Sequence, residues 1–409
     1  MVVGGGHAAG ELAVSLRQEG YTGRILIVGA ESHLPYQRPP LSKAFLSGKV
    51  AQEGLAIRPA VSYEKAAIDL SLSTKIVRID RAGSFAVSAN GEEIPYDRLV
   101  LATGGRARQL TVPGWNGRGV FSLRTIDDVL RIRREFKPGR RLVIIGAGYV
   151  GLEVAAVAIQ CGLHVTVLEA AERVLARVVA PQLSAFYEQV HRRAGVEIRT
   201  GTEVVSIDAE TVGTLGLLNL RCSDGTALGA DLVLVGIGLV PNTELAEAAG
   251  LDVDNGIVVD EFARSSDPKI LAIGDCANHF NEFAGRRMRL ESVQNAIELA
   301  RTAAATLCGK VRPYRVIPWF WSDQYHLKLQ MAGLSHGYQE MVLRGTFESE
   351  SFICFYLQGG RVIAADAVNR PADFMHTKRL IAEGGTSLSA HALADESCSL
   401  KIATGLLPA

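Results

Sequence analysis

The sequence predicts an α/β protein with two Rossmann-like, doubly wound nucleotide-binding domains. Two observations lead to this prediction. A glycine fingerprint between a short apolar run and a helix opens the chain, and the same strand, turn, helix and strand pattern begins again at residue 141. The length of 409 residues also exceeds what one hydrophobic core commonly supports, so we expect more than one domain.

The first fingerprint lies in "MVVGGGHAAGELAVSLRQEG", where Gly4, Gly6 and Ala9 occupy the three G-x-G-x-x-G/A positions. The first glycine permits a tight turn, the second lets the backbone approach a pyrophosphate, and the small third residue lets the helix pack on the strand. The helix N-terminus then faces the phosphates. The next apolar run, "RILIVGAE", leads to Glu31, which can accept hydrogen bonds from ribose hydroxyls. Taken alone, the pattern is also compatible with an ordinary glycine turn.

The second fingerprint lies in "RRLVIIGAGYVGLEVAAVAIQCGLHVTVLEA" and repeats the whole unit, with glycines at Gly146, Gly148 and Gly151. Two complete units predict two dinucleotide sites. Glu169 ends the second strand of this unit and predicts NADH rather than NADPH, because a 2′-phosphate would bring negative charge against the carboxylate. Two alternatives remain: Arg173 can turn toward a phosphate and soften this preference, and Glu169 can be a plain surface acid.

Three further apolar runs end in glycine turns. "LVLATGG" (99–105) and "LVLVGIGLVPN" (232–242) suit the two crossings between domains, and their turns contain the candidate cofactor contacts Thr103 and Gly238. "ILAIGDCANH" (270–279) places Asp275 where it can bind a sugar-alcohol chain while the next helix start stabilises phosphate. The alternative for Asp275 is an ordinary helix N-cap.

The composition gives no general reason to bind nucleic acid or an anionic membrane, because 43 basic and 43 acidic residues give a formal net charge of zero. The six cysteines are scattered without metal-ligand spacing, which predicts reduced thiols, no metal site and a cytoplasmic protein. The apolar runs are short and interrupted by glycine, so we read them as buried strands and expect no membrane span.

The motifs taken in order resemble those of the FAD-dependent pyridine-nucleotide oxidoreductases, over nearly the whole chain. They are "HLPYQRPPLSKAFL", the two fingerprints, "ATGG", "GIGLVPN", "AIGDCA", "RLESVQNA" and "PWFWSDQ". Within that family the chain is most similar to the NADH-dependent ferredoxin reductases. The resemblance implies a glutathione-reductase-type fold, with an FAD domain at 1–105 and 239–313, an NAD domain at 106–238, and a small α+β C-terminal domain with a β-sheet at 314–409.

The resemblance also implies a catalytic pair, in which Lys43 lies beside the flavin N5 region and pairs with Glu153 of "GLEVAA". A buried Lys–Glu pair tolerates neither member alone, and its positive end can stabilise negative charge on reduced flavin. The alternative for Lys43 is a solvated helix residue. Because "PLSKAF" contains no cysteine, electrons on the flavin cannot pass to a dithiol there and must leave directly.

Several other cofactor contacts follow from the resemblance. Arg38 is expected to contact the flavin or the pyrophosphate, with a surface arginine as the alternative. Tyr149 and Trp321 are expected to flank the flavin, although each is also compatible with a plain core residue. Glu291 and Val293 of "RLESVQNA" complete the expected cofactor-binding set.

The function implied is hydride transfer from NADH to FAD, followed by single-electron transfer to a 2Fe–2S ferredoxin. That ferredoxin would be acidic and serve a haem-thiolate monooxygenase or a ring-hydroxylating dioxygenase. Basic segments at 124–141 and 309–315 are candidate docking surfaces, or else solvated faces. The alternatives are a rubredoxin reductase and, less favoured, an apoptosis-inducing flavoprotein whose redox state controls an interaction. We expect a monomer or weak dimer.

Overall fold

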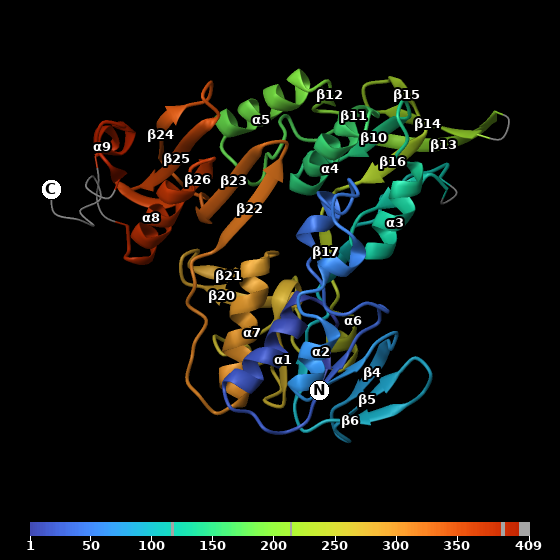
Figure 1. Cartoon of the computed structure of the whole chain (residues 1–409), viewed down its shortest axis with the longest axis vertical. Coiled ribbons are helices and arrows are strands. Elements are labelled where there is room, and N and C mark those ends of the chain that lie inside the picture. The colour runs from blue at the N-terminus through green and yellow to red at the C-terminus, as the bar shows by residue number, and fades with distance from the viewer. Residues whose placement is uncertain (116–117, 213–214, 386–388, 401–409) are drawn as a thin grey trace. The chain divides into compact units, whose positions relative to one another are not determined.

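The computed structural model describes residues 1–115, 118–212, 215–385 and 389–400. The chain forms two compact units (Figure 1). The first contains Met1–Arg38, Glu53–Arg106 and Val240–Phe320, and the second contains Pro39–Gln52, Ala107–Leu239 and Trp321–Ala409. The predicted α/β class is confirmed, because each unit is built on a parallel sheet with helices.

The first unit is organised by a five-stranded parallel sheet in the order β19-β7-β1-β2-β3. The strands β1, β2, β7 and β19 are short, mostly buried apolar runs, as is typical of parallel sheets covered by helices, whereas β3 at the edge is only partly buried. The five strands are β1 (Val2–Val3), β2 (Ile25–Val28), β3 (Ile68–Ser71), β7 (Leu99–Leu101) and β19 (Ile270–Ala272). Helices α1 (His7–Gln18) and α7 (Val293–Leu307) lie side by side (Figure 1) and pack against one another.

Smaller elements complete the first unit. The antiparallel sheet β4-β5-β6 contributes four buried residues to the hydrophobic core of this unit: Ile76, Ile79, Ala86 and Ile94. The bounds are β4 (Ile76–Asp80), β5 (Phe85–Ser88), β6 (Glu93–Pro95), β18 (Ile257–Val258), β20 (Ala277–Asn281), β21 (Arg286–Met288), α2 (Ala60–Lys65), α6 (Glu244–Ala248) and the 3-10 turn η3 (Gly274–Cys276). The chain passes between the units after Arg38, in η2 (Gln52–Leu55), in the paired strands β8 (Gly105–Ala107) and β17 (Leu239–Pro241), and after Phe320.

The second unit repeats the parallel architecture in the order β12-β11-β10-β16-β9. These strands are β9 (Val120–Ser122), β10 (Arg141–Ile145), β11 (His164–Leu168), β12 (Glu197–Arg199) and β16 (Leu232–Val235). The helices are α3 (Ile126–Glu135), α4 (Tyr149–Gln160) and α5 (Pro181–Arg193), and an antiparallel sheet joins β13 (Val204–Val212), β14 (Leu215–Cys222) and β15 (Ala227–Ala230). The segment Pro39–Gln52, with the 3-10 turn η1 (Pro39–Ser42), belongs to this unit.

The C-terminal part of the second unit is a sheet in the order β22-β23-β26-β25-β24, covered by helix α8. Its elements are β22 (Trp319–Gln324), β23 (Leu327–Gly333), β24 (Glu340–Thr346), β25 (Ser351–Gln358), β26 (Arg361–Val368), α8 (Pro371–Ala382) and α9 (Ala390–Ala394). Phe186 of α5 meets Phe352 of β25 edge to face, with ring centroids 5.0 Å apart. Because 107–239 and 321–409 lie in one compact unit, the expected boundary between them stays a prediction.

Candidate functional site

The first glycine turn has a shape that only small residues allow. Gly4 has φ +123°, and a Cβ there would lie 2.1 Å from the carbonyl oxygen of Ala102. A Cβ on Gly6, by contrast, would meet no atom within 4 Å in the described part of the chain. Ala9 is fully buried under the turn. The open space beside Gly6, at the start of α1, fits the close approach of a pyrophosphate.

The second glycine turn has the same construction. Gly146 has φ +103°, and its Cβ would lie 2.6 Å from the carbonyl oxygen of Gly236. A Cβ on Gly151 would lie 2.1 Å from the carbonyl oxygen of Gly146, so helix α4 can pack against the turn only without a side chain there. The Cβ position of Gly148 is open to 4 Å among the described residues. The turn therefore fits a second dinucleotide.

A carboxylate lies after the second strand of each nucleotide-binding motif. Glu31 accepts hydrogen bonds from Arg38 Nη2 (2.8 Å) and from the Tyr36 hydroxyl (2.7 Å). Glu169 accepts from the backbone N–H of Ala147 (2.7 Å), inside the second glycine turn, and from that of Ala171 (2.9 Å). Each carboxylate oxygen keeps a lone pair for a ribose hydroxyl. The structure thus places Glu169 against the second glycine turn, and Glu31 against Arg38, another predicted cofactor contact.

Arg173, which the sequence allows to turn toward a phosphate, has defined backbone partners. Arg173 donates to the carbonyl oxygens of Val179 (2.9 Å) and Ala176 (2.7 Å), so its guanidinium holds the loop that follows Glu169. Gly238 follows β16 with φ +110°, where the nearest atom to a Cβ would be Arg177 Nη2 at 4.0 Å.

Thr103 and Asp275 lie at the ends of neighbouring strands in the first unit. The Thr103 hydroxyl donates to the backbone carbonyl oxygen of Asn242 (2.7 Å), and the side-chain amide of Asn242 donates to the backbone carbonyl oxygen of Thr103 (2.9 Å). The turn before Asp275 contains Gly274, whose Cβ would lie 3.1 Å from the Cβ of Ala8. The Asp275 turn therefore lies against the start of α1, beside the first glycine turn.

The start of α7 contributes two predicted residues and one that sequence reasoning missed. Glu291 forms an ion pair with Arg289 (2.6 Å), and Val293 is the first residue of the helix. Gln294 follows; it is 5% exposed, and neither amide atom has a hydrogen-bond partner among the described residues. Nδ1 of His7, at the start of α1, is likewise buried and has no hydrogen-bond partner among the described residues. Because buried polar atoms are rarely left unpaired, these atoms fit a site for a polar ligand.

The predicted ion pair between Lys43 and Glu153 is present, with 2.7 Å between Lys43 Nζ and Glu153 Oε2. The Glu153 side chain is 4% exposed and that of Lys43 18%. The hydroxyl of Ser42 donates to Glu153 Oε2 (2.5 Å), and that of Ser322 donates to Oε1 (2.6 Å). Sequence reasoning missed both serines, although each lies inside a motif that carried the resemblance.

The two predicted aromatic contacts both lie in the second unit. The Tyr149 hydroxyl donates to Met331 Sδ of β23 (2.7 Å), and burial raises its pKa well above the ordinary value. Trp321 is half-buried in β22, directly before Ser322.

All six cysteines lie in described parts of the chain and are free thiols. Burial raises the pKa of Cys161, Cys222, Cys276, Cys308 and Cys354. These five therefore carry little thiolate, the form that exchanges with disulfides.

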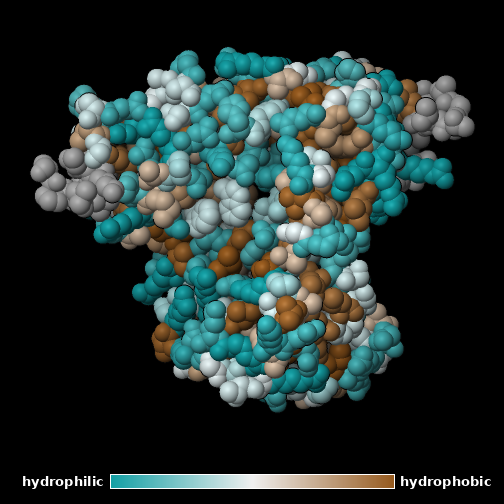
Figure 2. Space-filling model, viewed as in Figure 1, coloured by the Kyte–Doolittle hydropathy of each residue, from teal (hydrophilic) through white to brown (hydrophobic). Residues whose placement is uncertain are grey.

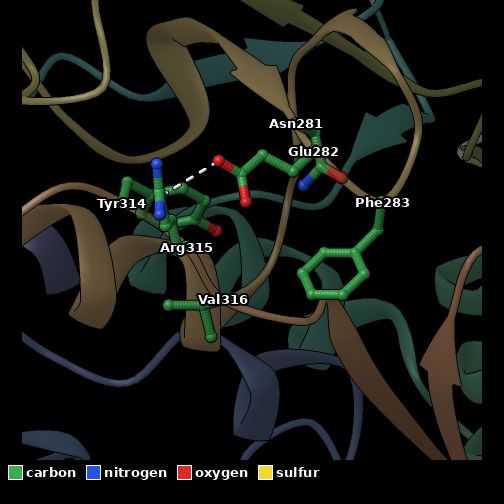
Figure 3. A pocket seen from close by; sticks show the side chains of 6 residues that line it. All are labelled: Asn281, Glu282, Phe283, Tyr314, Arg315 and Val316. Carbon is green, nitrogen blue, oxygen red and sulfur yellow. Dashed lines mark ion pairs between the residues drawn. The ribbon is translucent and has the colours of Figure 1, made fainter. Parts of the chain in front are cut away.

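The described residues form neither a metal site nor a membrane-spanning helix. No three His, Cys, Asp or Glu side chains there gather in a way that could hold a metal ion. Within the same ranges, no helix has both the length and the apolar character needed to cross a bilayer. A shallow depression of the first unit is lined by Asn281, Glu282, Phe283, Tyr314, Arg315 and Val316 (Figure 3). The ion pair between Glu282 and Arg315 (3.0 Å) lies in it, and it contains none of the predicted site residues.

A few large apolar side chains remain exposed on the surface. Hydrophilic residues cover much of the face seen in Figure 2, with hydrophobic residues scattered between them. Phe280 and Phe283, at and beyond the end of β20, are 48% and 42% exposed. Scattered apolar residues of this kind are normal on a folded protein and mark no site by themselves.

Known proteins share this sequence and fold along nearly their whole length. Residues 1–304 match the sequence model of the pyridine nucleotide-disulphide oxidoreductase family, and residues 319–404 match that of the reductase C-terminal domain. Putidaredoxin reductase of Pseudomonas putida is 48% identical over 404 residues, which cover 98% of this chain and 95% of the relative. A rubredoxin-NAD(+) reductase of the same species is 40% identical, covering 91% and 96%.

A solved structure is equally similar. In the crystal structure of the covalent putidaredoxin reductase–putidaredoxin complex, the matched chain is 47% identical to this one. The match covers 99% of this chain and 97% of that one, with a TM-score of 0.94. The predicted resemblance is thereby confirmed. The chain belongs to the pyridine nucleotide-disulphide oxidoreductase family, as an oxidoreductase that uses FAD and NAD(H).

Proposed function

We propose that the chain is an NADH-dependent ferredoxin reductase, which oxidises one NADH to NAD⁺ and a proton and reduces two molecules of a 2Fe–2S ferredoxin by one electron each. The observation that carries this proposal is the state of the thiols. The six free cysteines include no C-x-x-C or C-x4-C pair, and "PLSKAF" has Lys43 where many flavin enzymes of this kind have a redox cysteine. Electrons that reach the flavin must therefore leave it for an external acceptor.

The two glycine turns divide the cofactors between the units. The first turn, with Glu31 and Asp275, would hold the phosphates, ribose and sugar-alcohol chain of FAD. The second turn, with Glu169, would hold NADH. Bound FAD supplies the redox chemistry, since it accepts electrons in pairs and releases them singly. Lys43 would place positive charge where FAD gains electrons, and Glu153 would keep that ammonium oriented.

The acceptor is inferred from the relatives. Putidaredoxin reductase and its complex with putidaredoxin support an iron–sulfur partner, and the rubredoxin-NAD(+) reductase supports a mononuclear iron protein as the second candidate. We further propose that the ferredoxin serves a haem-thiolate monooxygenase, with a ring-hydroxylating dioxygenase as the alternative. Free thiols support a reducing compartment such as the cytoplasm.

Reductive titration tests the proposed electron route. NADH should deliver two electrons per chain, because no protein dithiol stores a second pair. Alkylation of the accessible thiols should leave ferredoxin reduction unchanged. Uptake of four electrons, or loss of turnover on alkylation while FAD stays bound, would contradict the proposal. Side-by-side assays with a 2Fe–2S ferredoxin and a rubredoxin then decide between the two acceptors.

The coenzyme preference should be strongly for NADH and should depend on Glu169. At ~4 Å and an effective dielectric near 20, a 2′-phosphate charge facing this carboxylate costs on the order of 4 kcal/mol. If screening by salt and solvent reduces this cost to about half, NADH is still preferred over NADPH by roughly 30-fold. Arg173 is held by the carbonyl oxygens of Val179 and Ala176, which reduces its reach toward a phosphate.

The measurement is kcat/KM for both coenzymes with the wild type and with Glu169→Ala. The variant should lose most of the preference for NADH. Because Glu169 also accepts the Ala147 N–H, some general loss of activity is expected, and the NADH-to-NADPH ratio cancels that loss. An unchanged ratio would show that this carboxylate does not contact the ribose.

The salt dependence of ferredoxin reduction tests electrostatic docking. In 309–315 every cation is paired: Lys310 with Glu19, Arg312 with Glu298 and Arg315 with Glu282. In 124–141, Arg131, Arg140 and Arg141 pair with acids, while Arg134 and Lys137 are exposed. An acidic partner should therefore be steered mainly by 124–141.

Ferredoxin reduction should slow as the Debye length falls from ~30 to ~8 Å, whereas reduction of a small artificial acceptor should change little. The variant Arg134→Gln/Lys137→Gln should reduce the salt dependence. Arg361→Gln, which removes an exposed charge elsewhere in the second unit, is the matched control and should not. Equal salt dependence of both acceptors would remove the docking hypothesis.

A further inference from the structure

We propose that Tyr325, His191, Gln324 and Ser322 form a one-directional chain of hydrogen bonds that ends on Glu153 and thereby positions Lys43. The inference rests on the proposed function, because it assumes that Lys43 acts on FAD. The chain lies within the second unit and links α5, β22 and α4. Its members are positioning residues, since they reach Lys43 only through Glu153.

Four contacts make the chain continuous. The Tyr325 hydroxyl lies 3.0 Å from His191 Nδ1, and His191 Nε2 lies 2.8 Å from Gln324 Oε1. Gln324 Nε2 donates to Ser322 Oγ (3.2 Å), which donates to Glu153 Oε1 (2.6 Å). Ser322 and Gln324 are two residues apart on β22 and so face the same side. Both are buried, as is His191.

The direction of the chain follows from the chemistry of its members. An amide oxygen only accepts, so His191 Nε2 must carry the proton that bonds to Gln324 Oε1. Burial lowers the pKa of His191 to about 4, so near neutral pH the ring is uncharged and its Nδ1 accepts from Tyr325. The Gln324 amide nitrogen only donates, which leaves the Ser322 hydroxyl proton for Glu153. Every donor therefore points toward the carboxylate.

A chain of aligned donors stabilises the charged form of the group at its end. Ser42 donates to the other oxygen, so both oxygens of Glu153 share their negative charge with hydroxyl groups. A carboxylate whose charge is partly taken up in this way neutralises Lys43 less completely. More of the positive field of Lys43 then remains to stabilise the electrons that FAD gains, which raises the midpoint potential of the bound cofactor.

The midpoint potential of FAD in the loaded protein is the main readout, measured by titration with dithionite against a reference dye. Ser322→Ala should weaken reduction of FAD about tenfold, which corresponds to a potential lower by about 30 mV for a two-electron couple. Gln324→Leu should lower it by a smaller amount, and Ser322→Thr, which keeps the hydroxyl, should restore it.

The matched control is Ser184→Ala. This change removes another buried hydroxyl of the second unit, which donates to the carbonyl oxygen of Val174 and has no link to Glu153. The control should leave the potential unchanged. If Ser322→Ala and Gln324→Leu behave like it, the inference is wrong.

The ¹⁵N NMR signals of His191 provide a second test that needs no substitution and no cofactor. A proton on Nε2 supports the chain, whereas a proton on Nδ1 reverses its direction and overturns the inference. Neither readout uses NADH or ferredoxin. A protein that shows the potential shifts but reduces no ferredoxin would therefore contradict the proposed function and leave this inference standing.

Discussion

Replacing either Lys43 or Glu153 alone by an apolar residue should destabilise the protein more than replacing both together. Removing one partner of a buried ion pair typically costs about 3–5 kcal/mol, because a charge is left in low dielectric, whereas apolar replacement of the whole pair is often nearly neutral. Glu153 is the more buried of the two, so Lys43→Met, which strands the carboxylate, should be the more damaging single change. The hydroxyl groups of Ser42 and Ser322 would compensate only part of that loss.

The free energy of unfolding in urea measures this effect, with the double substitution Lys43→Met/Glu153→Leu completing the cycle. FAD retention on a desalting column is the functional readout. The exposed pair Arg379–Glu383 of α8 and its C-terminus is the control, where the same cycle should give less than about 1 kcal/mol. If both single variants unfold like the wild type, Lys43 is the solvated helix residue of the alternative reading.

Two buried groups should give the unfolding free energy opposite dependences on pH. Burial lowers the pKa of His191 to about 4 from 6.5, so between these values only the unfolded chain takes up the proton. Its contribution to stability is complete above pH 6.5 and is lost as the pH falls toward 4, by about 3 kcal/mol. Burial raises the pKa of Asp366 to about 7 from 3.8. Its contribution is complete below pH 3.8 and is lost as the pH rises toward 7, by roughly 4 kcal/mol.

In the wild type these two contributions largely cancel between pH 4 and 7, and single substitutions should reveal them. Relative to wild type, His191→Gln should gain stability as the pH falls through this range. Asp366→Asn, which keeps an acceptor for the Tyr356 hydroxyl, should gain as it rises. Urea unfolding at pH 4.5, 5.5 and 6.5 gives the differences, in which all other titrating groups cancel. Parallel curves for the three proteins would show that neither group has the proposed pKa.

The nucleotide turns were predictable because their requirements are local. A backbone with positive φ at Gly4 and Gly146, and a carbonyl oxygen where a Cβ would be, force glycine at these positions, and the apolar strand and helix around each turn are visible in a short window. Glu31 and Glu169 follow from the same repeat. The family resemblance added Lys43 and Glu153, whose 2.7 Å contact joins residues 110 positions apart in sequence.

The environment of that pair was not predictable from the sequence. Ser42, Ser322, Gln324 and His191 are ordinary residues in their own segments, and no periodicity marks a hydrogen bond that joins α5, β22 and α4. The same holds for the cations of 309–315, whose charge is balanced by distant acids such as Glu19. Sequence determined the two nucleotide turns and the absence of a redox cysteine near Lys43. Only the tertiary structure decided which polar groups surround Glu153, because burial and long-range contacts set the protonation of a group and the direction of its hydrogen bonds.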